Sequence, residues 1–307
     1  MPFIAIPGTF HLVNKTVAGT PSGFEPDGDS IHFRPSNPAQ LARLRVVGRP
    51  LKLTTIGSVM LRFESIDALE LHYQADNGVT SHQPRPLADQ ARDFLTGLLG
   101  MNPVPYVLPR GVRVRPPVPR DAVTGYIVAR TLEVFGRPVS FAFAGPSPFA
   151  DGADVFLTPD VLKTSLNYKL LRNGHAYPLF YDTLFVDLRK AMQVATRQAR
   201  ASGKGIWALD RTNAGLALPN GPADLEQNGV IFPKLFRRLT DFLARGGPAG
   251  GAVSLADFPA WLDASEERVL DLPAVNFTGF DNLVEVGPDL SVRMTRKPEE
   301  IVFIGAK

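Results

Sequence analysis

The sequence predicts an α+β fold, in which a β-rich half is followed by helices that cover it. Between residues 9 and 72, apolar and β-branched runs alternate with turn clusters rich in Gly, Pro and Ser, as in a series of strands. Further along, residues 164–174 and 186–205 carry apolar side chains at helical spacing, and each of these segments ends in glycine.

The individual elements follow from local patterns. A strand is predicted over residues 58–66, because apolar and polar side chains alternate along it. We expect residues 74–86 to form a polar loop and residues 87–100 to form a helix that ends at a glycine. Residues 124–145 predict two strands joined by a tight turn at residues 134–136.

Composition sets the limits on function. The 307 residues are enough for one large domain or two modest ones. The chain has no cysteine, which excludes disulfides, cysteine nucleophiles and thiolate metal sites. A net charge of +3 permits a polyanionic partner without predicting one. No apolar run approaches the roughly 20 residues that span a bilayer, and no signal peptide is visible, so we expect a cytoplasmic protein without a membrane partner.

The character of the chain changes after about Asp210, where a stretch rich in Pro, Gly and Asn begins. An amphipathic helix is predicted within residues 231–247 and a capped helix from Ser254, followed by one or two strands near the end. We therefore divide the chain into a domain of residues 1–210 and a mainly helical C-terminal accessory region of residues 211–307. No chemical motif is found in that region, and its role stays open.

Three short segments concentrate acids and arginines. Residues 27–30 read Asp-Gly-Asp-Ser, a turn that can present oxygen ligands to a hard cation, although Asp-Gly in a hairpin is usually only a turn. Residues 62–70 carry an arginine and two acids where a strand runs out, which taken alone is ordinary surface charge. Residues 133–137 place an arginine on a hairpin turn. Together they supply the two arginines, two metal-binding acids and third acid that suit attack on a phosphodiester.

In their order along the chain, these segments resemble the staphylococcal nuclease family. The resemblance covers about Phe10 to Asp210, with longer loops than the minimal members of the family. It rests on five motifs in the family's order: Asp27-Gly28-Asp29-Ser30, the spacing of Arg62, Asp67 and Glu70, Gly136-Arg137, the helical segment 165–177, and the segment 196–207 that ends in Lys-Gly-Ile-Trp.

The resemblance implies a five-stranded OB-type β-barrel with covering helices, and a nuclease that hydrolyses the phosphodiester bonds of DNA, RNA or both. It also implies a Ca²⁺ ion, with other divalent cations as alternatives. Asp29 and Asp67 would be its carboxylate ligands, and the backbone carbonyl of Ala68 would complete the protein's share of the coordination. Family members often have threonine at the position of Ala68, which matters little if only the carbonyl binds the metal.

The catalytic roles come from the same resemblance. Arg62 and Arg137 would hold the scissile phosphate and oppose the charge of the transition state, since a guanidinium fork suits phosphate oxygens. Glu70 would serve the attacking water, either by positioning it or by deprotonating it. By analogy with the removal of one oxyanion donor, losing either arginine should raise the barrier by about 3 kcal/mol.

Further residues are candidates for substrate contact. Phe135 stands where a tyrosine commonly contacts a terminal phosphate in the family. Three aromatic residues after the predicted helix of residues 164–174 lie where family members contact a base, with core packing as the open alternative. Two arginines of the proline-rich segment 101–120 belong either to a basic rim or to a solvated connector. The three aromatic residues are Tyr177, Phe180 and Tyr181, and the two arginines are Arg113 and Arg115.

Two alternatives remain beside the nuclease interpretation. The first is a non-catalytic module that binds nucleic acid or protein on a nuclease-like barrel, although degenerate copies usually lose an arginine or a metal-binding acid and all five are present here. The second is that the C-terminal region binds a protein partner or covers the active site, which would make a regulated nuclease. The sequence does not distinguish DNA from RNA, or an endonuclease from an exonuclease.

Overall fold

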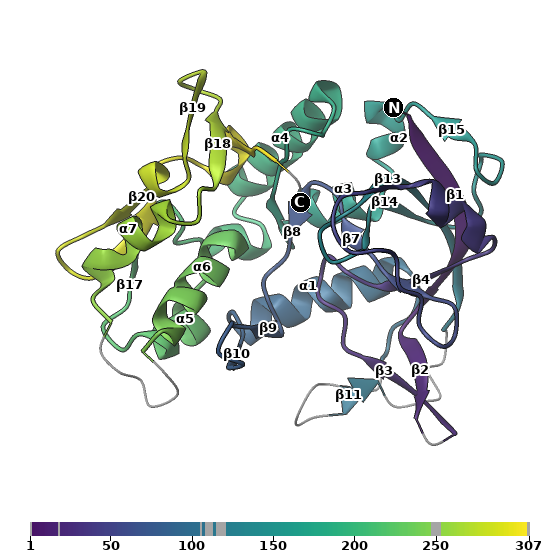
Figure 1. Ribbon diagram of the computed structural model, residues 1–307, viewed down its shortest axis with the longest axis horizontal. Coiled ribbons are helices and arrows are strands. Elements are labelled where there is room, and N and C mark those ends of the chain that lie inside the picture. Colours follow the sequence, from purple (N-terminus) through teal and green to yellow (C-terminus); the bar gives the residue numbers. More distant parts are fainter. Residues whose placement is uncertain are drawn as a thin grey trace.

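The computed structural model describes residues 2–17, 19–104, 106–107, 113–114, 121–246 and 253–305. It is a mixed α+β structure whose largest sheet is nearly closed into a barrel (Figure 1). The strands follow the order β6-β4-β1-β13-β14-β7, and only Leu61 separates the two end strands in the chain. The six strands are β1 (Phe3–His11), β4 (His32–Pro35), β6 (Val59–Met60), β7 (Arg62–Phe63), β13 (Val123–Leu132) and β14 (Pro138–Ala144).

The hairpin of β13 and β14 confirms the predicted pair of strands and their tight turn. The two strands pair in antiparallel register from Gly125 opposite Ala144 to Leu132 opposite Pro138. Gly136 has a φ of 85° in the turn, and a Cβ there would lie 2.6 Å from the carbonyl oxygen of Pro50. A glycine is therefore required both by the left-handed backbone and by the close approach.

The strand predicted over residues 58–66 is broken into β6, β7 and β8 (Ile66–Asp67). The expected alternation is present, because Val59, Leu61 and Phe63 are all buried. The backbone then turns at Ser65, which has a φ of 69°, and Asp67 pairs with Tyr177 of β16 (Tyr177–Pro178). This turn carries the chain out of the barrel sheet and into the site described below.

The remaining strands of this half are short. Residues 74–86, expected to be a loop, include part of the hairpin of β9 and β10. A separate four-stranded sheet has the order β11-β12-β3-β2, and two further strands extend the barrel sheet, β15 by pairing with β1 and β5 by pairing with β13. Their bounds are β2 (Val13–Val17), β3 (Thr20–Phe24), β5 (Arg45–Val46), β9 (Tyr73–Gln74), β10 (Thr80–Ser81), β11 (Tyr106–Val107), β12 (Arg113–Val114) and β15 (Asp154–Val155).

The predicted helices of residues 1–210 are present. The helix expected at residues 87–100 begins two residues earlier, with Pro86 in its first turn, and Gly100 follows it with a φ of 70°. Residues 164–174 and 186–205 each contain one of the expected helices. The helices are α1 (Arg85–Leu98), α2 (Pro159–Leu162), α3 (Leu166–Arg172) and α4 (Val186–Ala201), with 3-10 helices at Pro38–Arg43 and Gly205–Ala208.

The buried side chain of Asn167 joins α3 to the barrel. Its Oδ1 accepts from the backbone N–H of Ala142 at 2.9 Å, and its Nδ2 donates to the carbonyls of Glu64 at 2.9 Å and Ser140 at 3.0 Å. The amide thus gives partners to the N–H of Ala142 and the carbonyl of Glu64, and adds a second bond to the carbonyl of Ser140, which also accepts from the N–H of Glu64. It fixes the end of β7 relative to β14, and so the turn that leads to Asp67.

The C-terminal part combines helices and sheets. Its described residues form three α-helices and two three-stranded sheets, with the strand orders β17-β21-β20 and β19-β18-β22. The one or two strands expected near the end are present as β21 and β22, but the description as mainly helical missed the other strands of these sheets. The elements are α5 (Pro222–Asn228), α6 (Pro233–Ala244), α7 (Phe258–Asp263), β17 (Leu216–Ala217), β18 (Arg268–Asp271), β19 (Asn276–Gly279), β20 (Val284–Val286), β21 (Ser291–Met294) and β22 (Ile301–Phe303), with 3-10 helices at Leu255–Asp257, Asp281–Leu283 and Pro298–Glu300.

Two hydrophobic cores hold the molecule together. The first fills the barrel and the faces of α3 and α4 that pack on it. The second contains Phe232 and Phe236 of the C-terminal part together with Leu69, Leu71 and Tyr177 of the N-terminal part. The C-terminal part is therefore packed against the chain that follows Asp67, as Figure 1 shows at the centre of the view. The division of the chain at residue 210 stays a prediction.

Within the residues that the structure describes, no helix is both long enough and apolar enough to span a bilayer.

Replacing Asn167 with alanine should lower the free energy of unfolding by about 3 kcal/mol, because the N–H of Ala142 and the carbonyl of Glu64 lose their buried partner. Urea unfolding measures this change. Asn173→Ala is the matched control on the same helix, where only a bond to the carbonyl of Lys169 is lost, and it should cost less than about 1 kcal/mol. Equal losses in both variants would contradict the proposed role of Asn167.

His32 makes part of the folding stability depend on pH. Burial, with a smaller contribution from the charge of His11, lowers the pKa of His32 from 6.5 to about 4. The unfolded chain therefore takes up this proton more readily, so the stability is complete above pH 6.5 and is lost as the pH falls towards 4. Between pH 7 and pH 5 the wild-type protein should lose about 2 kcal/mol more than a His32→Gln variant. Urea unfolding at the two pH values tests this, and parallel losses would disprove it.

Candidate active site

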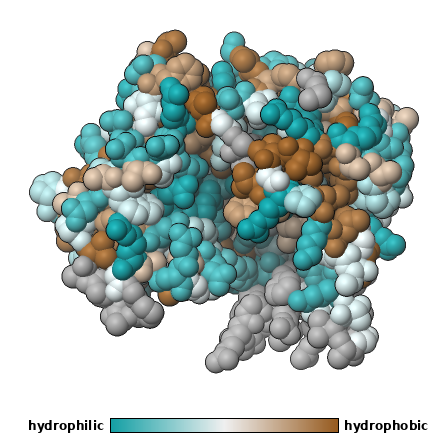
Figure 2. Space-filling view, viewed as in Figure 1, coloured by the Kyte–Doolittle hydropathy of each residue, from teal (hydrophilic) through white to brown (hydrophobic). Residues whose placement is uncertain are grey.

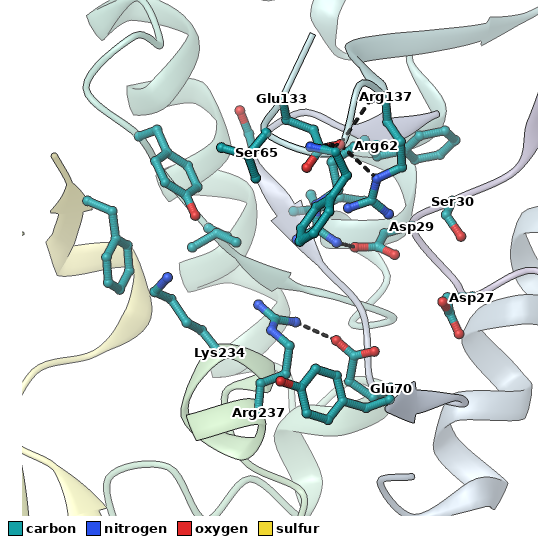
Figure 3. Close-up of a pocket in the computed structure, with 18 of the residues that line it drawn as sticks. Asp27, Asp29, Ser30, Arg62, Ser65, Glu70, Glu133, Arg137, Lys234 and Arg237 are labelled. Carbon is teal, nitrogen blue, oxygen red and sulfur yellow. Dashed lines mark hydrogen bonds and ion pairs between the residues drawn. The ribbon is translucent and has the colours of Figure 1, made fainter. Parts of the chain in front are cut away.

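A cavity of about 660 Å³ lies between the barrel and the C-terminal part. Figure 2 shows a hollow between these two parts, with a hydrophilic interior. The barrel side contributes Asp29, Arg62 and Arg137, and α6 contributes Arg237 and its neighbours. Figure 3 shows Lys234 and Arg237 reaching into the cavity from the side opposite Arg137. The walls thus come from segments up to 277 residues apart in the chain, 304 against 27.

Arg62 joins the two aspartates that the sequence assigns to a metal. Its Nη1 lies 2.9 Å from Oδ2 of Asp29, and its Nη2 lies 2.5 Å from Oδ1 of Asp67. The three residues meet because the N–H of Phe63 donates to the carbonyl of Asp29 at 3.0 Å, which aligns the Asp-Gly-Asp turn with β7. The structure therefore brings together residues that are up to 38 positions apart, 67 against 29.

The Asp-Gly-Asp turn packs against small side chains. A Cβ on Gly28 would lie 2.7 Å from the Cβ of Ala91 in α1 and 3.0 Å from the Cβ of Ala68. Ala68 is buried beneath the turn. The close packing leaves room only for glycine at position 28, and it sets where the carboxylates of Asp27 and Asp29 lie relative to Asp67.

The C-terminal part supplies an arginine that the sequence did not indicate. Arg237 of α6 donates from Nη2 to Oδ2 of Asp67 at 2.9 Å and from Nη1 to Oδ1 of Asp67 at 3.2 Å. Its Nη1 also pairs with Oε1 of Glu70, as the dashed line in Figure 3 marks. The two oxygens of Asp67 are thus covered by Arg62 and Arg237, and Asp67 has no exposed surface.

The carboxylates of the site affect one another. Burial raises the pKa of Asp27 to about 7, with further contributions from the charges of Glu70 and Asp29. Burial also raises the pKa values of Asp29 and Glu70, although Arg62 and Arg237 respectively oppose the increase. Burial acts on Asp67 in the same direction, but the charges of Arg237 and Arg62 outweigh it and the pKa of Asp67 is lowered. Asp67 is therefore ionised. In the other three acids, burial and the negative charge of neighbouring carboxylates disfavour the ionised form.

Arg137 is held on its hairpin turn by Glu133. One oxygen of the buried Glu133 carboxylate accepts from Nε of Arg137 at 3.1 Å, from its backbone N–H at 3.0 Å and from the N–H of Phe135 at 3.1 Å. The bond to Nε leaves the two terminal nitrogens of Arg137 for the cavity. Phe135 is 63% exposed beside it and also lines the cavity.

Glu25 is a second residue that sequence reasoning missed. Its fully buried carboxylate pairs with Arg92, with Arg85 at 3.2 Å and with His72 at 2.8 Å. The two arginines are seven positions apart on α1 and therefore lie on the same face of the helix. This spacing of two arginines, on a helix that is otherwise packed, is the signal that could have indicated a buried acid. The network anchors the chain two residues before Asp27.

The remaining residues predicted to contact the substrate do not all lie at the cavity. Tyr181 lines the cavity, whereas Tyr177 and Phe180 are fully buried, which is the core alternative left open for them. The hydroxyl of Tyr177 donates to Oδ1 of Asp210 at 2.9 Å. Arg113 belongs to β12, where the structure describes its backbone but not its side chain. Arg115 lies outside the described residues.

A metal ion needs donors that are free to converge, and the described residues contain no group of three His, Asp or Glu side chains arranged in that way. The cause is visible in the contacts, since the arginines occupy oxygens that a metal would use. The chemistry of the donors still fits a hard cation, because carboxylate and carbonyl oxygens are what Ca²⁺ prefers.

Comparison with known proteins does not identify the chain. A scan against protein-family models finds no match, and a search of curated proteins finds none either. The case for a function therefore rests on the site itself.

Replacing Gly28 with alanine should lower the free energy of unfolding by about 1–3 kcal/mol, because the new methyl group meets Ala91 and Ala68 at less than contact distance. Gly97→Ala in α1 is the control, since its nearest neighbour is the flexible amide of Asn102 at 3.2 Å and alanine favours the helix. Urea unfolding compares the two variants. If Gly28→Ala is as stable as the wild-type protein, the turn is not packed as described.

Proposed function

We propose that the chain is a metal-dependent phosphodiesterase of the nuclease type, acting on DNA, RNA or both. The observation that carries the proposal is the meeting of Asp29, Arg62, Asp67 and Glu70 through ion pairs, with Arg137 facing the same cavity. The family resemblance picked out these five residues from their order in the sequence alone. Their convergence in space is what a shared chemical role requires.

The two predicted arginines suit a phosphate that accumulates charge as it reacts. Arg62 is largely buried, while Arg137 is one-third exposed and directs its terminal nitrogens to the cavity. Guanidinium groups fixed in advance stabilise the developing charge without a cost of reorganisation. Glu133 supplies that fixing for Arg137, and Asp29 with Asp67 supplies it for Arg62. The arginines would thus hold the scissile phosphate from two sides.

The carboxylates would hold the cation and serve the water. Asp29, Asp67 and the carbonyl of Ala68 would be the protein ligands of a Ca²⁺ ion, which when bound would polarise the phosphate and bring the water near it. Glu70 lines the cavity within the same cluster, where its carboxylate can orient the attacking water or accept its proton.

We further propose that the barrel-like sheet is the five-stranded OB-type barrel of the nuclease family. When β6 and β7 are counted as one interrupted strand, the circle β4-β1-β13-β14 is completed by a single fifth strand. The parallel pairing of β14 with β7 joins the two sides. Arg62 thus lies on β7, beside β14, the strand that begins directly after Arg137. A phosphate contact shared by the two arginines requires such neighbouring strands.

The test is digestion of single-stranded DNA, double-stranded DNA and RNA by the purified protein, with Ca²⁺, with Mg²⁺ and with a chelator. We expect cleavage that depends on calcium, and a fall of about 100-fold or more for Glu70→Gln and Arg137→Ala, equivalent to about 3 kcal/mol in the barrier. Arg293→Ala is the matched control, because Arg293 pairs with Glu285 away from the cavity and its loss should leave the rate unchanged.

Absence of cleavage by folded protein under every one of those conditions would overturn the proposal. The alternative would then be a module that binds nucleic acid without cleaving it. A gel-shift measurement with the same substrates separates these outcomes, because such a module would still bind them.

A further inference from the structure

Arg237 pairs with the two acids that the proposed function needs most. It forms two bonds to Asp67 and one ion pair to Glu70, and it reaches them from a helix 167 residues further along the chain than Glu70. These are one proposed metal ligand and the residue assigned to the attacking water. The contact is therefore made to the reacting centre rather than to a remote surface.

The bonds to Asp67 leave no oxygen free for a cation. Arg62 and Arg237 both donate to Oδ1, and Arg237 alone covers Oδ2. Asp67 accordingly does not line the cavity, whereas Asp29 and Glu70 do. A divalent cation can reach Asp67 from the cavity only when the guanidinium of Arg237 leaves it, because both groups need the same oxygens.

We propose that Arg237 and a divalent cation are alternative occupants of the Asp67–Glu70 pair, so that the C-terminal part controls when the site is loaded. This inference rests on the proposed function for its biological meaning, but the competition itself concerns only binding. The guanidinium holds the two acids in place while the cation is absent. Binding of the cation then requires a concentration high enough to displace the guanidinium of Arg237 from the two acids.

The exchange involves the side chain of Arg237 rather than movement of the whole helix. The backbone of α6 is fixed by Phe236 and Leu239 in the second core. It is also tied to the 73–77 segment, since the hydroxyl of Tyr73 donates to Asp241 at 2.7 Å and the amide of Asn77 donates to the carbonyl of Ala244 at 3.0 Å. The adjoining cavity of about 660 Å³ has room for a guanidinium that swings away.

The neighbouring arginine provides a matched control. Arg238 lies on the same helix and lines the same cavity, but its guanidinium pairs with Glu267 at 2.8 and 2.9 Å rather than with Asp67 or Glu70. Removing Arg238 subtracts the same charge at nearly the same place. If removing Arg237 changes the calcium affinity more than removing Arg238 does, the difference comes from the direct contact of Arg237 with the acids and not from the loss of a positive charge near the site.

Binding of Ca²⁺ to the full-length protein is to be measured by titration calorimetry in the wild type, Arg237→Ala, Arg237→Gln and Arg238→Ala. We expect both substitutions of Arg237 to tighten calcium binding at least tenfold, and Arg238→Ala to change it less than threefold. Arg237→Gln keeps most of the side-chain volume, so at least one variant should retain the fold, which circular dichroism checks. Equal affinities in all four proteins, or no calcium binding in any of them, would overturn the inference.

A second measurement needs no substitution. In the wild-type protein, calcium should shift or broaden the Nε–H resonance of Arg237 in a nitrogen–proton spectrum and leave that of Arg238 in place. An unmoved Arg237 resonance at saturating calcium would refute the exchange. The two proposals can fail separately, since tighter binding without cleavage would remove the nuclease function only, and calcium-dependent cleavage with equal affinities would remove the competition only.

Discussion

The site depends on one buried charge, the carboxylate of Asp67. It has no exposed surface, and it is compensated by Arg62 from the barrel and by Arg237 from the C-terminal part. A buried ion needs such partners in good geometry, and the loss of one partner leaves an uncompensated charge in a low-dielectric environment. The barrel and the C-terminal part must therefore fold into one arrangement, and the second core, which draws residues from both, provides it.

Local chemistry accounts for what the sequence predicts well. Glycines at helix ends and at the 134–136 turn, and apolar spacing along α1, α3 and α4, act within a few residues and can be read from the chain. Even the break after β7 has a local component in the positive φ of Ser65. Asn167 is readable as part of a family motif, but its bonds to two strand segments explain why an amide stands there.

Contacts between distant segments could not be derived in this way. Arg237 belongs to a pair of arginines on an amphipathic helix, which from sequence looks like an ordinary solvated face. Only the packing of α6 on the chain after Asp67 turns one of the pair towards the acids and the other towards Glu267. Glu25 is similar, because its partners lie on α1 and at His72, just before β9. The spacing of Arg85 and Arg92 hints at a buried acid on one face of α1, but which acid it is, like the target of Arg237, depends on tertiary packing.

The second core also holds both tryptophans of the chain. Trp207 lies edge-on to Tyr177 with 4.9 Å between ring centroids and under the guanidinium of Arg200 at 4.0 Å, while Trp261 packs on Phe242 and Phe258. The barrel core has neither. Intrinsic tryptophan fluorescence therefore reports on the second core, with Trp207 against Tyr177 of the N-terminal part and Trp261 within the C-terminal part, and the barrel core contributes no tryptophan signal. A fluorescence change that precedes the loss of β-sheet signal would reveal the second core opening while the barrel is still folded.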